Sequence, residues 1–191
     1  MKYIIFSLIF ISVFLIAVLS SKYVSKEFSI KESKTMAIFV AVSLIYTLLL
    51  LYFFGVSAIT VKGLILLFIL LISSAEDFKT HQCADYIHIM IIISAFIGTK
   101  LKQIPEMLLC GAFVMALMLV TVIITKSEIG GADIKLSAAC SFLLGMQKGF
   151  AGLLIGLVLA IIVNLIKAKD KKAGFPMIPY LAVGFLTAYF I

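Results

Sequence analysis

Residues 58–77 read AITVKGLILLFILLISSAED, an apolar run with one lysine near its start and two acids at its end. An apolar stretch of about 18 residues is long enough to cross a bilayer as a helix. Similar stretches recur along the chain, so the sequence predicts an all-α, polytopic membrane protein with about eight transmembrane helices. The predicted segments are 3–21, 36–54, 58–75, 86–99, 106–125, 135–146, 149–166 and 176–191.

The composition of the whole chain agrees with this prediction. Of its 191 residues, 64% are hydrophobic and only 13% are charged. A soluble domain of this size needs far more polar surface than that. The composition excludes a cytosolic enzyme, a secreted disulfide scaffold and a nucleic-acid binder. We therefore expect a multi-pass protein of the cell membrane, with lipid as its surroundings.

Two of the predicted segments, 86–99 and 135–146, are short for a full crossing. They either tilt into locally thinned bilayer or are surrounded by protein. The sequence Gly145-Met146-Gln147-Lys148-Gly149 predicts a break between the sixth and seventh segments.

The lysines orient the chain, because cytoplasmic loops carry an excess of positive charge. Eleven lysines fall in one set of loops and five in the other, so the larger set is predicted to be cytoplasmic and both termini outside. The larger set is Lys22, Lys26, Lys31, Lys34, Lys79, Lys126, Lys135, Lys167, Lys169, Lys171 and Lys172. Residues 22–35 are predicted to be a solvated basic loop. Since basic residues follow the first segment rather than precede it, that segment is predicted to be an uncleaved helix.

Carboxylates gather at the cytoplasmic ends of the predicted helices. Asp77 ends the third segment, and Asp85 opens the fourth. Asp133 precedes the sixth segment and directly follows Gly130-Gly131-Ala132. Ionisable groups at a membrane boundary are costly and therefore suggest function. The small residues predict an unusual turn that lets an extended peptide approach the carboxylate.

The first of these motifs resembles one found in the type IV prepilin peptidases, which are membrane aspartic proteases of the GxGD type. Their first motif is an aspartate followed eight residues later by Pro-Asp or Pro-Asn. Asp77 and Asp85 hold this spacing, with Ala84 at the proline position.

The second family motif is Gly-x-Gly-Asp followed by an aliphatic residue and lysine. Here it reads Gly130-Gly131-Ala132-Asp133-Ile134-Lys135, with Ala132 at the second glycine. Residues 175–184 are similar to the proline-rich start of the family's last helix. The resemblance covers roughly 58–191, and it leaves 1–57 as additional N-terminal helices with a basic cytoplasmic loop.

The resemblance implies an aspartic endopeptidase that cleaves the basic leader peptide from type IV prepilins or pseudopilins at the cytoplasmic membrane face. Larger members also methylate the new N-terminus and carry a loop with paired CxxC motifs. The cysteines here, Cys83, Cys110 and Cys140, form no such motif, so we expect a peptidase without N-methyltransferase activity. The alternatives are a transporter or channel with intramembrane aspartates, and a non-catalytic membrane subunit.

Two carboxylates can hydrolyse a peptide when one is ionised and the other protonated. Asp133 is expected at a helix N-terminus, where the helix dipole favours the anion, and Asp77 at a C-terminus. This argument predicts Asp133 as the base and Asp77 as the proton-bearing partner, with no metal or cofactor. Asp85 is expected to cap the fourth segment, with shaping of the loop or contact with substrate as the alternatives. Lys135 either biases Asp133 towards the anion or contacts lipid headgroups, and Glu76 is expected to be a charge at the rim.

Overall fold

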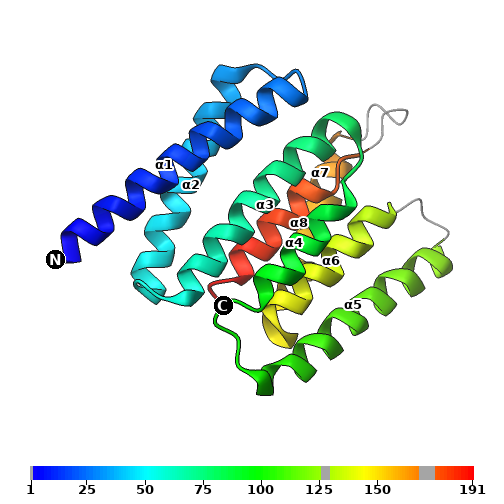
Figure 1. Ribbon diagram of the computed structural model, residues 1–191. Coiled ribbons are helices and arrows are strands. Elements are labelled where there is room, and N and C mark those ends of the chain that lie inside the picture. The colour runs from blue at the N-terminus through cyan, green and yellow to red at the C-terminus, as the bar shows by residue number, and fades with distance from the viewer. Residues whose placement is uncertain (1, 126–129, 168–174) are drawn as a thin grey trace.

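The computed structural model describes residues 2–125, 130–167 and 175–191, and every regular element in them is a helix (Figure 1). The helices are α1 (Lys2–Glu27), α2 (Glu32–Phe54), α3 (Ala58–Thr80), α4 (Asp85–Ala95), the short 3₁₀ helix η1 (Leu101–Gln103), α5 (Ile104–Thr125), α6 (Gly131–Leu144), α7 (Met146–Lys167) and α8 (Ile178–Ala188). Four of the lysines used to orient the chain lie outside the described residues: Lys126, Lys169, Lys171 and Lys172.

Each of the eight predicted segments corresponds to one α-helix, but the α-helices differ in length. Within the described residues, five are long and apolar enough to cross a membrane, namely α1, α2, α3, α5 with the preceding η1, and α7. By contrast, α4 and α8 have 11 residues each and α6 has 14. At a rise of about 1.5 Å per residue, α6 extends roughly 21 Å, less than the hydrocarbon core of about 30 Å.

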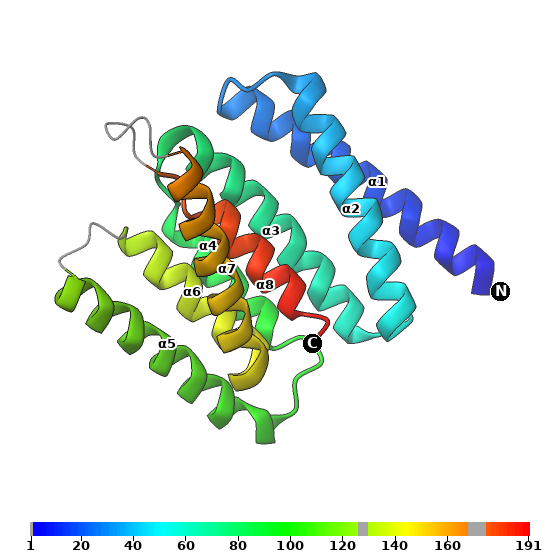
Figure 2. The same cartoon turned by 180° about the vertical axis from the view of Figure 1, so that it is seen from behind.

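The surroundings of α6 explain how so short a helix fits into the bundle. It packs against α4, α5, α7 and α8 (Figures 1 and 2). Leu136 and Cys140 on α6 have no exposed surface. Of the two alternatives for a short segment, enclosure by protein therefore applies to α6. The predicted break is confirmed: Gly145 ends α6 with φ at +78°, a conformation that suits glycine, and α7 begins at Met146.

The predicted loop at 22–35 is largely wrong. Helix α1 continues to Glu27 and α2 begins at Glu32, which leaves residues 28–31 between them. Lysine and glutamate are good helix formers, so the loss of apolar character does not end a helix that has already been propagated. The α1–α2 hairpin lies at one edge of the bundle and packs against α3 (Figure 2).

Helix α8 lies between α3 and α7 and approaches α7 very closely (Figure 1). A Cβ atom added at Gly184 would lie 2.7 Å from the Cα of Gly156. Leu181 and Phe185 flank this contact and are fully buried. Small residues at a helix crossing let the two backbones approach and gain dispersion contacts. The glycines therefore allow a short helix to occupy the centre of the bundle.

We expect Gly184→Val to destabilise the fold, because its side chain would run into the backbone of α7. Overpacking of a close contact costs about 1–3 kcal/mol or more. The measurement is thermal unfolding of the purified protein in detergent micelles. The control is Val183→Leu, which changes the adjacent outward-facing residue and should leave the melting temperature almost unchanged. Equal melting temperatures for the two variants would contradict the close approach of α7 and α8.

Candidate active site

Asp77 lies in the last turns of α3, and its side chain is buried. One carboxylate oxygen, Oδ2, accepts a hydrogen bond of 2.9 Å from the backbone N–H of Ile178. Ile178 is the first residue of α8, where N–H groups lack partners within the helix and the dipole is positive. The start of α8 therefore stabilises the carboxylate form of Asp77.

Asp133 lies in the first turn of α6, at the same end of the bundle as Asp77 (Figure 1). It is half-buried and precedes the apolar segment predicted for this helix. Burial and the nearby charge of Asp77 raise the pKa of Asp133 to about 7, while a backbone hydrogen bond from Gly130 acts in the opposite direction. The fold thus brings two aspartates from α3 and α6 close enough to affect each other's ionisation.

This arrangement favours the reverse of the roles that helix dipoles alone had indicated. Asp77 does lie at the C-terminal end of α3, but it also faces the N-terminus of α8, which sequence order does not reveal. Two neighbouring carboxylates are not readily ionised together, so they tend to share one proton. The Ile178 hydrogen bond favours the proton on Asp133, whereas the burial of Asp77 disfavours its anion.

The prediction that Asp85 caps α4 is wrong. Ala84 occupies the N-cap position, and no side-chain capping bond is formed there. Instead, Asp85 Oδ1 accepts a hydrogen bond of 2.7 Å from Lys135 Nζ, which links α4 to α6. The hydrogen bond and charge of Lys135 lower the pKa of Asp85. Both side chains are exposed, so this pair contributes little to stability, but it places opposite charges beside Asp133.

Glu76 is half-buried, so it is only in part the rim charge that was expected. Its Oε2 atom is buried and has no hydrogen-bond partner among the described residues, whereas the backbone N–H of Ala84 interacts with the carboxylate. Nearby, burial followed by the charges of Glu76, Asp77, Asp133 and Asp85 raises the pKa of the Cys83 thiol to about 12. The thiol therefore stays protonated and is a poor nucleophile. This cluster could not be predicted from the sequence, because the short connection between α3 and α4 brings Cys83 back towards the acids.

The two glycines before Asp133 do not form an unusual turn. Gly130 has φ −62° and ψ 138°, and Gly131 does not have positive φ either. The two glycines differ in the room that a side chain would have at each position. A Cβ at Gly130 would lie 3.1 Å from Asp133 Oδ2, whereas a Cβ at Gly131 would meet none of the described residues within 4 Å. Gly130 therefore leaves room for the Asp133 carboxylate, and Gly131 borders open space beside it.

The described parts of the chain contain no group of three or more His, Cys, Asp or Glu residues that could hold a metal ion. His81 is exposed at the end of α3, whereas His88 is buried on α4.

These features define the protein as a helical, multi-pass membrane protein with paired aspartates at one end of its bundle. A model of the type IV leader peptidase family matches residues 64–165, more than half of the chain, and this range includes Asp77, Asp85 and Asp133. The chain belongs to the type IV leader peptidase family, which makes it a protease and confirms the resemblance inferred from its motifs. Comparison with curated proteins and with solved structures gives no match.

We expect Gly131→Val to reduce leader cleavage while leaving the amount of folded protein in the membrane unchanged. The added side chain meets no neighbour, so it costs little stability, but it fills space beside Asp133. A small misplacement of substrate can lower the rate on the order of 10²-fold. The measurement compares cleavage with membrane level, and Ala132→Gly, which adds no bulk, is the control. Normal cleavage in Gly131→Val would show that the substrate does not approach along this turn.

Proposed function

We propose that this protein is an aspartic endopeptidase that removes the basic leader peptide from type IV prepilins or pseudopilins at the cytoplasmic face of the cell membrane. The observation that carries the proposal is the meeting of Asp77 and Asp133, from separate helices, at one end of the bundle. The family match includes both residues. The lysine excess in the loops at this end supports the cytoplasmic orientation.

In the proposed reaction, the Asp77 carboxylate takes a proton from a water molecule, whose oxygen attacks the scissile carbonyl carbon. Asp133 donates its proton to the carbonyl oxygen, which gives a neutral tetrahedral intermediate. The C–N bond then breaks as Asp77 returns its proton to the leaving amine and Asp133 recovers a proton from a hydroxyl group. The Ile178 N–H supports this sequence because its hydrogen bond favours the anionic form of Asp77, the form that deprotonates water.

The surroundings of the pair suit a substrate with a basic leader followed by an apolar helix. The open space beside Gly131 gives an extended segment access to Asp133. The apolar helix that follows the leader would remain in the lipid beside the bundle.

We assign residues 58–191 to the catalytic membrane domain and 1–57 to an additional helical hairpin. Eight crossings with both termini outside are consistent with the lysine distribution if the short helices α4, α6 and α8 cross within surrounding protein. The lack of CxxC motifs supports a peptidase without N-methyltransferase activity. A transporter or channel is less well supported, because the aspartates lie near one end of the helices and not at their middle.

We expect Asp77→Asn and Asp133→Asn each to abolish leader cleavage, while both variants still accumulate in the membrane. Asparagine keeps the shape of aspartate but cannot exchange the proton, and such acid–base steps contribute about 10²–10⁴-fold in rate. The measurement is cleavage of a prepilin-type substrate by purified protein. Glu27→Gln, at an exposed acid at the end of α1, is the control and should cleave normally. Substantial cleavage by either asparagine variant would rule out the aspartic mechanism.

The pH dependence of kcat/KM tests whether the aspartate pair acts with one shared proton. If the pair needs that proton, the rate should fall as pH rises through about 7, because the raised pKa marks its loss. Well above this value, the fall should approach about tenfold per pH unit. A rate that stays constant or rises through this range would contradict a proton held by the pair. Melting temperatures measured at each pH serve as the control for unfolding.

A further inference from the structure

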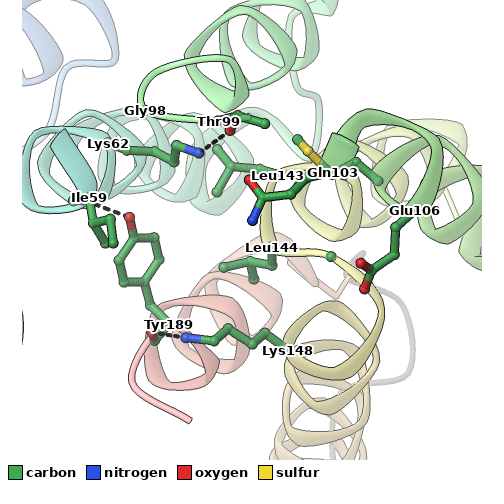
Figure 3. Close-up of a pocket in the computed structure, with 12 residues that line it drawn as sticks. Ile59, Lys62, Gly98, Thr99, Gln103, Glu106, Leu143, Leu144, Lys148 and Tyr189 are labelled. Carbon is green, nitrogen blue, oxygen red and sulfur yellow. Dashed lines mark hydrogen bonds between the residues drawn. The ribbon is translucent and has the colours of Figure 1, made fainter. Parts of the chain in front are cut away.

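A cavity of about 290 Å³ opens at the end of the bundle away from the aspartates (Figure 3). It is lined by residues from the start of α3, the connection after α4, the start of α5 and the ends of α6 and α8. Along α3, a rise of about 1.5 Å per residue separates Lys62 at this cavity from Asp77 by roughly 23 Å. That distance approaches the thickness of the hydrocarbon core, so the cavity lies near the headgroups of the leaflet opposite the aspartates.

Two lysine ammonium groups line the cavity without a carboxylate partner. Lys62 Nζ donates to Thr99 Oγ1 at 2.7 Å, and Lys148 Nζ donates to the Tyr189 carbonyl oxygen at 3.0 Å (Figure 3). Neither lysine forms a salt bridge within the described residues, although both are only partly exposed. An ammonium group has three donors, so each retains two for a ligand. Partly buried positive charge that lacks a counter-charge favours an anion.

Gln103 adds a neutral donor to the same cavity. Its Oε1 atom accepts a hydrogen bond of 3.0 Å from the backbone N–H of Lys100, which identifies the other end of the amide as the NH₂ group. The Gln103 side chain lines the cavity together with the two lysines (Figure 3). Donors from α3, η1 and α7 therefore surround one cavity, as the oxygens of a phosphate group require.

The other residues that line the cavity restrict the charge and the chemical class of the anion that it can bind. Glu106 also lines the cavity, so two positive charges and one negative charge leave a net charge that one singly charged anion would neutralise. A phosphodiester carries a single negative charge, whereas the Glu106 carboxylate would repel a dianionic phosphate. Met107, Leu143 and Leu144 provide apolar surface beside the polar groups. This combination suits a group that is anionic at one end and joined to hydrocarbon at the other.

We propose that this cavity binds the phosphodiester headgroup of an anionic phospholipid from the leaflet opposite the aspartates. Lys62, Lys148 and Gln103 hold the phosphate oxygens, and Glu106 selects against a second negative charge. The lysines also hold the ends of α4 and α8 through Thr99 and Tyr189. Bound lipid therefore completes the charge balance at this end of the bundle.

The test is a titration of the delipidated, full-length protein in detergent with dioleoylphosphatidylglycerol, followed by native mass spectrometry and by melting temperature. Gln103→Glu keeps the acceptor for the Lys100 N–H but replaces a donor with a negative charge, so lipid affinity should fall by about tenfold or more. Lys148→Gln should also weaken binding. The control, Lys102→Gln, changes an exposed lysine outside the cavity and should bind as the unmodified protein does.

Three results would overturn the proposal. In the first, Gln103→Glu retains the lipid affinity and the lipid-induced rise in melting temperature of the unmodified protein. In the second, inorganic phosphate raises the melting temperature as much as the lipid does at equal concentration, which would identify a site for a free anion. If Lys148 only holds the helix ends, Lys148→Gln should lower the melting temperature without lipid and leave the lipid affinity unchanged. This third result would also count against the proposal.

Discussion

The hydrogen bond from the Ile178 N–H to the Asp77 carboxylate is the contact on which the arrangement of this end of the bundle depends. It joins the last turns of α3 to the first residue of α8, although most of the chain separates them. It satisfies a helix-terminal N–H and a buried carboxylate together, so neither is left without a partner inside the protein. It also favours the carboxylate form of Asp77 before any substrate is present, which is a form of electrostatic preorganisation.

Hydropathy was sufficient to locate the helices, because each needs an apolar stretch that local composition records. The break at Gly145 was also visible, since glycine has a local conformational role there. What composition could not show was which helices would be enclosed. The shortness of α6 is tolerated because α4, α5, α7 and α8 surround it, and those neighbours are known only once the chain is folded. The extension of α1 to Glu27 was missed because polar residues were interpreted as a loop.

The sequence identified the residues of the candidate site but not the contacts between them. Spacing singled out Asp77 and Asp133, and the fold places both at one end, while their catalytic role remains our proposal. The partner of Asp85 could not be read from spacing, because Lys135 arrives from another helix. The dipole argument for the acid and base was incomplete for the same reason: it considered each aspartate within its own helix and could not include Ile178 from α8.

The shortness of α6 has a consequence for how the membrane stays sealed. One end of this helix carries Asp133, and the other reaches the floor of the cavity at Leu143, so roughly 15 Å of protein separates the two along the helix. A hydrolase in a bilayer must admit water to its carboxylates without becoming a path for ions. Here the permeability barrier is thinner than the lipid around it and rests on tightly packed side chains such as Leu136 and Cys140. Enlarging the water-filled space at either end would therefore make the barrier to ions thinner.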